Sequence, residues 1–175
     1  MKVYTRRGDT GETDMFPSGR VPKNHPRMEV LGTLDELGCW LGVVRSQEIE
    51  VFFEEYLHKM QQLLFVLGGE LACDDPGKMG MKRITATDVT ELERYIDFID
   101  EKLPPIRTML CSSGRPASTF CQLARSVCRR LERRVATFAD QGGTVSPEVR
   151  AWLNRFSDFL FVLGRFFNTN PEEFV

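Results

Sequence analysis

Four charged residues in one stretch have types and spacing that could bind an anion. Arg125, Arg129, Glu132 and Arg133 fall at i, i+4, i+7 and i+8 of LARSVCRRLERRV, so on a helix they share one face. Guanidinium groups bind phosphate because their forked donors match its oxygens. A charged helix face is more commonly solvated and held by ion pairs within the helix, and composition alone favours that interpretation.

Two further polar positions could take part in a site. Asn154 and Asp158 lie at i and i+4 in a segment crowded with aromatic residues, which leaves partial burial with a partner and simple exposure equally open. Asp35 stands beside Leu34 and Leu37, and exposure is the default expectation for a single acid of this kind.

The N-terminal stretch YTRRGDTGETDMF, residues 4–16, combines glycines, threonines and two arginines. Glycines let backbone N–H groups turn toward an anion, hydroxyls add donors, and arginines neutralise charge. The stretch matches neither the phosphate-loop pattern nor the dinucleotide pattern, both of which are rich in glycine. Taken alone, it reads more simply as a loosely packed tail.

Composition limits the classes of protein to which the chain can belong. Its 175 residues suit one compact domain, and 23 Lys plus Arg against 25 Asp plus Glu give a formal net charge of −2. These values predict no general binding to nucleic acid or membranes. We find no signal peptide and no apolar run of the roughly 18 residues that a membrane span needs.

Cysteine and histidine usage predicts a cytoplasmic protein without a protein-ligated metal. The cysteines are odd in number, lack a C-x-x-C pair and mostly stand among apolar neighbours, so we expect buried thiols in a reducing compartment; they are Cys39, Cys73, Cys111, Cys121 and Cys128. His25 and His58 are the two histidines, and neither belongs to an H-E-x-x-H or E-x-x-H pattern.

Hydrophobic periodicity predicts helices over residues 26–47, 50–72, 85–105, 115–140 and 146–168. The first two have apolar stripes with steps of three or four, made of Val30, Leu34, Leu37, Leu41 and Val44, and of Phe53, Leu57, Met60, Leu64 and Leu67. On the fourth, the predicted core-facing side carries Phe120, Leu123, Val127, Leu131 and Val135. Only KVYT, residues 2–5, could form a strand.

The predicted helix ends complete the fold prediction. Pro26 suits a first turn, Thr87 is the predicted cap of the third helix, Gly142 follows the fourth, and Ser146 caps the fifth. Five helices with short connections predict an all-α, antiparallel five-helix bundle. We expect one domain over residues 1–175, divided into a non-helical arm at 1–25 and a helical bundle at 26–170.

Four ordered motifs resemble the ATP:cob(I)alamin adenosyltransferase family of the propanediol-utilisation and mitochondrial B12 type. The arm stretch is similar to its T-R-x-G-D-x-G-x-T opening, and RVPKNHPRMEVLGTLDELGCWLG to its second signature. LARSVCRRLERRV and LNRFSDFLFVLGRFFN resemble its two C-terminal signatures. The resemblance implies a ferritin-like helical bundle in a homotrimer, with ATP bound between adjacent subunits and the arm folded over it.

The implied reaction transfers the 5′-deoxyadenosyl group of ATP to the Co(I) centre of cobalamin and releases triphosphate. ATP would be the co-substrate with Mg²⁺, the corrinoid the second substrate, and a reductase or an adenosylcobalamin-dependent acceptor enzyme a further partner. The catalytic residues carried over by motif are Arg125, Arg129 and Asp35. The implied binding residues are Thr5, Arg6, Arg7, Gly8, Thr13, Asp14, Lys23, Arg129, Arg130, Glu132, Arg133 and Asn154, with Met109 on the corrinoid side.

The chain departs from the family pattern mainly on the corrinoid side. Met109 replaces a phenylalanine that helps remove the lower corrinoid ligand, and Val66 replaces an acid expected to pair with Arg125. CSSG keeps only Gly114 of a P-G-G motif, and Thr10 stands where lysine is common. These changes predict retained ATP binding with altered corrinoid handling. The alternative is a catalytically weak paralogue that binds ATP or corrinoid as a sensor, carrier or assembly partner.

Overall fold

The computed structural model describes residues 2–15, 19–107 and 109–168, which form two short strands and five helices. The elements in chain order are β1 (Glu12–Met15), β2 (Gly19–Pro22), α1 (Pro26–Arg45), α2 (Val51–Ala72), α3 (Ala86–Asp100), α4 (Pro116–Asp140) and α5 (Pro147–Phe167). The predicted all-α five-helix bundle is therefore confirmed.

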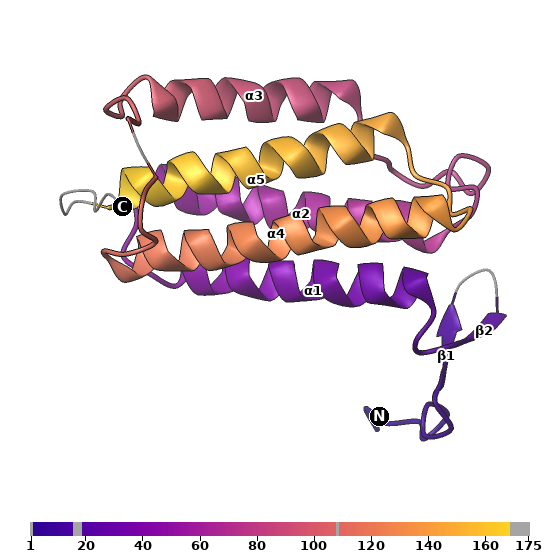
Figure 1. The fold of residues 1–175 in the computed structure, drawn as a ribbon. Coiled ribbons are helices and arrows are strands. Elements are labelled where there is room, and N and C mark those ends of the chain that lie inside the picture. The colour runs from indigo at the N-terminus through magenta and orange to yellow at the C-terminus, as the bar shows by residue number, and fades with distance from the viewer. Residues whose placement is uncertain (1, 16–18, 108, 169–175) are drawn as a thin grey trace.

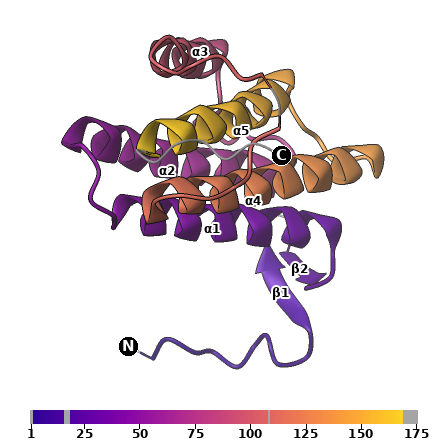
Figure 2. The same cartoon turned by 60° about the vertical axis from the view of Figure 1, so that its left-hand side comes forward.

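The helices form a bundle in which α1 packs against α2 and α4, α4 against α5, and α5 against α3 (Figures 1 and 2). α2 closes the bundle, because its Tyr56 ring contacts Phe159 of α5 and Tyr95 of α3. α1 runs antiparallel to both α2 and α4, and α4 runs antiparallel to α5. α3 lies on the outside of the bundle against α5, and both helices begin at the right-hand side of Figure 1. The arrangement leaves one side of α4 facing α1 and another facing α5, so its many arginines point to different surroundings.

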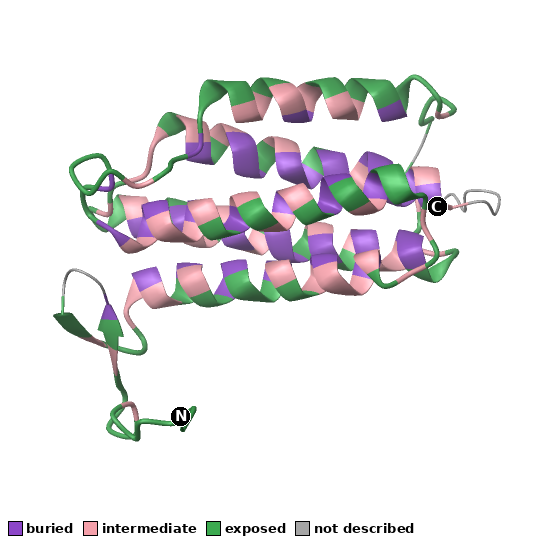
Figure 3. Ribbon diagram, turned by 180° about the vertical axis from the view of Figure 1, so that it is seen from behind, coloured by how far each residue is buried: buried purple, intermediate pink, exposed green. Residues whose placement is uncertain are grey.

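The apolar stripes predicted for the first two helices form the core. All ten residues named for them are buried, and none is more than 8% exposed. α5 adds the largest side chains, with Trp152 stacked on Phe156 at 4.7 Å between ring centroids. Figure 3 shows the buried positions on the inward faces of the helices, with α3 exposed along its outer side. On α4 the prediction fails at Leu123, which is 44% exposed.

Local capping explains where several helices begin. Pro26 and Pro147 occupy first-turn positions of α1 and α5, and the Ser146 hydroxyl caps α5 by accepting from the Val149 N–H, as predicted. The prediction for α3 is wrong by two residues. Thr85 is its cap, because the Thr85 hydroxyl accepts from the Asp88 N–H while the Asp88 carboxylate accepts from the Thr85 N–H.

The strand and thiol predictions also need correction. KVYT is not a strand; β1 and β2 instead form an antiparallel hairpin further along the arm, with Thr13 opposite Val21. Cys73, Cys121 and Cys128 are buried as expected, whereas Cys39 and Cys111 are exposed. Phe16 of the arm motif and the last two residues of the predicted bundle, 169 and 170, lie outside the described residues. Within the described ranges, no helix is long and apolar enough to cross a membrane.

Candidate functional site

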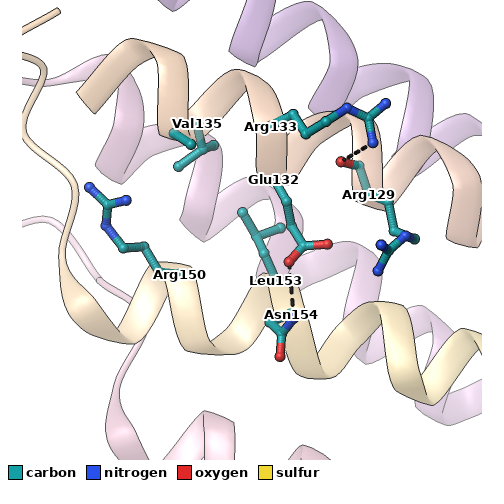
Figure 4. A pocket seen from close by; sticks show the side chains of 8 residues that line it. Arg129, Glu132, Arg133, Val135, Arg150, Leu153 and Asn154 are labelled. Atoms are coloured by element: carbon teal, nitrogen blue, oxygen red, sulfur yellow. Dashed lines mark hydrogen bonds between the residues drawn. The ribbon is translucent and has the colours of Figure 1, made fainter. Parts of the chain in front are cut away.

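A groove of about 400 Å³ runs between α4 and α5. Figure 4 shows Arg129 near one end and Arg150 near the other, with Glu132 and Asn154 between them. The described residues lining the groove are Arg129, Glu132, Arg133, Val135, Ala136, Arg150, Leu153 and Asn154. Three guanidinium groups and one carboxylate therefore surround an open space, which gives the groove a positive balance.

Hydrogen bonds fix the groove floor but leave its arginines available. The Asn154 Nδ2 donates to Glu132 Oε1 at 3.2 Å, and Arg155 Nη1 donates to the Asn154 Oδ1 at 2.7 Å. Arg133 Nη1 donates to the Arg129 carbonyl oxygen at 3.0 Å. Among the described residues, no carboxylate forms an ion pair with Arg129 or Arg133. The ion-paired helix face favoured by composition is thus absent at this point of α4.

The two polar positions that the sequence left open on α5 are both exposed. Asn154 still has the partners described above, whereas Asp158 lies outside the residues that line the groove. Arg150 is a groove residue that the sequence analysis missed. The available signal was its spacing, because Arg150 and Asn154 stand at i and i+4 and hence on one face of α5.

Arg125 lies in a different, smaller cavity beside the connection that precedes α4. Its Nε donates to Gln122 Oε1 at 2.7 Å, and its Cζ lies 5.8 Å from the centroid of the Phe161 ring. Partial burial lowers the pKa of the Arg125 guanidinium, and the positive charge of Arg129 lowers it further. The two arginines therefore influence each other electrostatically although only Arg129 lines the α4–α5 groove.

Arg130 faces α1 rather than the groove. Its guanidinium pairs with the Glu36 carboxylate, and one turn further along α4 Arg134 pairs with Glu29 at 2.9 Å. These contacts join the two helices. In this single chain, the arginines of α4 thus divide three ways: Arg129 and Arg133 face the groove, Arg130 and Arg134 tie α4 to α1, and Arg125 lies in the smaller cavity.

Asp35 lines a separate cavity of about 280 Å³ between α1 and α2. The cavity is largely apolar, and its described lining residues are Leu34, Asp35, Gly38, Cys39, Gly42, Gln61, Leu64 and Phe65. Phe65 is 81% exposed, and its neighbour Val66 is half-buried. Met109, in the connection between α3 and α4, is 77% exposed and does not line this cavity.

The arm residues form their own compact cluster. Arg7 pairs with Asp14 at 2.9 Å, and Arg20 Nη2 donates to the Arg7 carbonyl oxygen at 2.8 Å, which closes the loop onto the hairpin. Gly8 lies against Lys23, since an added Cβ would come within 3.1 Å of the Lys23 Nζ. The loop therefore places the Lys23 ammonium directly beside its backbone.

The same loop contains an unusual backbone conformation. Arg6 has a φ of +62°, which is uncommon for a residue with a side chain, and the Thr5 hydroxyl accepts from the Arg7 N–H at 3.4 Å. Residues in such conformations persist where surrounding contacts hold them, often at binding sites. Thr13, in β1, is half-buried.

The arm and the groove do not meet within one chain. Figures 1 and 2 show the arm extending beyond α1, on the side of α1 that faces away from α5. The structure thus gathers Arg129, Glu132, Arg133 and Asn154 in one place and the arm residues in another. Asp35 and Arg125 occupy two further cavities.

Comparisons with known proteins agree with one another. Residues 3–167 match the family described as cobalamin adenosyltransferase. The chain is 37% identical to a corrinoid adenosyltransferase of Citrobacter freundii over 98% of this chain and 97% of that one. It is also 37% identical to the human corrinoid adenosyltransferase MMAB, over 94% of this chain and 68% of that one.

Solved structures give the same result. One is a phenylalanine-to-histidine variant of a PduO-type ATP:corrinoid adenosyltransferase from Lactobacillus reuteri, complexed with cobalamin and ATP. It superposes with a TM-score of 0.91 and 28% sequence identity, over 99% of this chain and 96% of that one. An arginine-to-lysine variant of the enzyme from the same organism, complexed with ATP, has a TM-score of 0.89 and 27% identity over 99% of both chains.

Proposed function

The chain belongs to the cobalamin adenosyltransferase family, and from that premise we propose that it transfers the 5′-deoxyadenosyl group of ATP to the cobalt of a corrinoid. The reaction forms a cobalt–carbon bond and breaks the bond between C5′ and the triphosphate oxygen. Both electrons of the new bond come from Co(I). Triphosphate leaves with the electron pair of the broken bond, so the reaction needs no protein nucleophile and no general base.

The groove between α4 and α5 is the observation that carries the proposal. A leaving triphosphate gains negative charge on its bridging oxygen, and fixed guanidinium donors stabilise such charge without reorganising. Arg129 and Arg133 meet this requirement because no described carboxylate pairs with them, and Arg150 adds a third cation from α5. The hydrogen bond from Asn154 to Glu132 joins α5 to α4 at the groove floor.

We further propose that the arm supplies the second half of the ATP site. Lys23, Arg7 and the loop around Gly8 offer positive charge and backbone donors, which suit a polyphosphate. Since the arm and the groove are apart in one chain, the proposal requires the arm of one subunit to reach the groove of another, in a homotrimer. Residues 1–25 would then act as a nucleotide-binding arm and residues 26–170 as the bundle of a single functional domain.

Mg²⁺ would enter with the triphosphate, because this ion is commonly held by one or two carboxylates together with substrate phosphates and water. Within the described ranges, no group of three or more His, Cys, Asp or Glu residues could hold a metal. Asp14 is the arm carboxylate that we propose for this contact, and it is paired with Arg7 and Arg20 in this structure.

The corrinoid belongs, in this proposal, on the apolar face between α1 and α2. Phe65, which is 81% exposed, offers apolar surface for a flat macrocycle, with the buried Leu34 behind it, and Asp35 adds one polar contact at its edge. Met109 would lie on the corrinoid side from the connection before α4. A cytoplasmic location, consistent with five free cysteines, and a reductase or acceptor enzyme as partner complete the proposal.

A spectral assay tests the proposed activity directly. The purified chain is mixed with MgATP and chemically reduced cobalamin, and the absorbance of adenosylcobalamin is followed together with the release of triphosphate. We expect both products in equal amounts. Binding of ATP or of corrinoid without either product would instead favour the catalytically weak sensor, carrier or assembly partner, and an absence of binding to both ligands would reject both interpretations.

A further inference from the structure

Arg27 is a buried arginine at the start of α1 and is 5% exposed. Its Nη2 donates to the Asp74 carboxylate, and its Nη1 lies 3.4 Å from the Ala72 carbonyl oxygen. Its Cζ stands 5.0 Å from the centroid of the Phe138 ring, and Nη1 also approaches the Met15 sulfur at 3.9 Å. One guanidinium group thus contacts the arm, the end of α2, the loop after it and the end of α4.

On the arm side, Arg27 contacts the last residue of β1. Met15, the last residue of β1, is 7% exposed and is the one buried residue among the described positions of the arm. Among the described residues, the weak hydrogen bond from Arg27 Nη1 to the Met15 sulfur is the side-chain hydrogen bond between the hairpin and the bundle. Arg27 is therefore one side chain through which the bundle contacts the hairpin, beside the backbone hydrogen bonds of residues 22–28 that lead from the hairpin into α1.

Stability alone gives little reason to bury a guanidinium here. Removing a charge from water is costly, and replacing a buried ion pair by an apolar side chain of similar volume is often neutral or stabilising. The Nε of Arg27 is buried without a hydrogen-bond partner, so the group is not even fully satisfied. Unlike an apolar side chain, a guanidinium group donates hydrogen bonds in fixed directions. Its planar arrangement of donors therefore fixes the relative positions of several partners at once.

The junction also lies on the helix that carries the groove. Phe138 follows the groove residue Ala136 by two positions on α4, near the turn that leads into α5. Gly143 lies in that turn against the same ring, since an added Cβ would come within 2.3 Å of the Phe138 Cζ. Arg27 and Gly143 therefore both contact a ring at the end of the α4–α5 pair. The hairpin junction is therefore joined to the C-terminal end of the helix that carries the groove residues.

We infer that Arg27 is a positioning residue, which fixes the direction in which the hairpin leaves the bundle and so delivers the arm to bound ATP. The inference rests on the proposed function and adds to it a residue that touches neither ATP nor corrinoid. A small change in the direction of the hairpin displaces the loop around Gly8, because this loop precedes β1 and is joined to the bundle through the hairpin. The contact between Gly8 and Lys23 would then change as well. Misplacement of binding groups by about 1 Å can cost about a hundredfold in rate.

The test compares Arg27→Met with a matched control, Glu70→Gln. Glu70 is also 5% exposed and lies near the same end of α2, where its carboxylate accepts from the Ile84 N–H at 2.9 Å and from the Ser146 hydroxyl at 2.8 Å. It does not contact the arm. For both full-length variants we would measure the melting temperature, the KM values for ATP and for reduced cobalamin, and the rate of tryptic cleavage after Arg20 and Lys23.

For Arg27→Met we expect the KM for ATP to rise about tenfold or more, the KM for cobalamin to change less than about twofold, and cleavage of the hairpin to accelerate. Glu70→Gln should lower the melting temperature yet keep the wild-type KM for ATP and cleavage rate. An unchanged KM for ATP in Arg27→Met, or an equal rise in Glu70→Gln, would overturn the inference.

A second variant covers the case in which Arg27→Met does not fold. Met15→Ala removes the arm side of the junction and leaves the bundle intact, and it should reproduce the rise in the KM for ATP and the faster cleavage. Normal kinetics and cleavage in Met15→Ala would also overturn the inference. If the wild-type chain makes no adenosylcobalamin, the proposed function fails, whereas the cleavage rates still decide whether Arg27 holds the hairpin.

Discussion

The groove between α4 and α5 and the cavity between α1 and α2 lie on different helix pairs of one bundle and differ in chemistry. The groove is lined by three arginines and the cavity by apolar side chains, with Asp35 the one charged residue among its described lining residues. Both spaces are open, with volumes of about 400 and 280 Å³. A polyanion suits the first and a broad apolar ring system the second.

Under the proposed function, the bundle would bind ATP and the corrinoid on different helix pairs. α4 and α5 have polar or charged residues on the face between them, while α1 and α2 leave Phe65 exposed beside a shallow apolar surface. If the proposal is right, damage to either face should raise the KM for one substrate and spare the other. Three substitutions test this separation.

Arg129→Ala should have the largest effect. Loss of one fixed cationic donor at a developing negative charge typically lowers the rate by about a hundredfold or more, so we expect kcat/KM for ATP to fall by that factor. The KM for cobalamin should stay near its wild-type value, and the helical circular dichroism signal should be retained.

The matched control for this change is Arg94→Ala, which removes an exposed arginine of α3 that lines neither space. Its kinetics should equal those of the wild type. If Arg129→Ala matched the wild type as well, Arg129 would not belong to the site, and the proposal that ATP binds in the charged groove would fail.

Phe65→Ala should impair cobalamin binding and spare ATP binding, with a smaller effect than that of Arg129→Ala. An aromatic side chain buried by a ligand contributes about 1.5 to 3 kcal/mol, so the KM for cobalamin should rise about tenfold or more while the KM for ATP is unchanged. Phe98→Ala, which truncates an exposed aromatic side chain on α3, is the control. Dissociation of the oligomer by Phe65→Ala, with an unchanged KM for cobalamin, would show that this face joins subunits instead.

The helices were predictable because each carries a long apolar stripe with helical period, as the ten buried stripe residues of α1 and α2 show. The failures are local. Thr85 rather than Thr87 caps α3 because Asp88 stands three residues after Thr85 and completes a reciprocal pair of hydrogen bonds. Leu123 is exposed because α4 carries apolar residues over a wider arc than the neighbouring helices cover.

The site was predictable as a list of residues but not as an arrangement. Motif resemblance supplied Arg125, Arg129 and Arg130 together, whereas the structure sends their side chains to a small cavity, to the groove and to Glu36. A helical step of 100° separates neighbouring side chains, so only the packing of α1 and α5 against α4 decides which arginine meets which neighbour. Arg27 and Arg150 were missed because their roles depend on contacts between elements distant in sequence.

Met109→Phe should change kcat least of the three substitutions, and whether kcat rises or falls tests the corrinoid side of the proposal. Met109 is 77% exposed, so a larger side chain can be accommodated without disturbing the core, and the exchange should leave the melting temperature unchanged. If methionine packs less well than phenylalanine against the corrinoid, the exchange should raise kcat. The rise should be less than about tenfold, because apolar exchanges of similar volume change the activation free energy modestly. The same exchange at Met79, which is 45% exposed in the loop after α2, should leave kcat unchanged. A fall in kcat for Met109→Phe would mean that the surrounding residues have adapted to methionine, and the separation of the two faces would then rest on Arg129 and Phe65 alone.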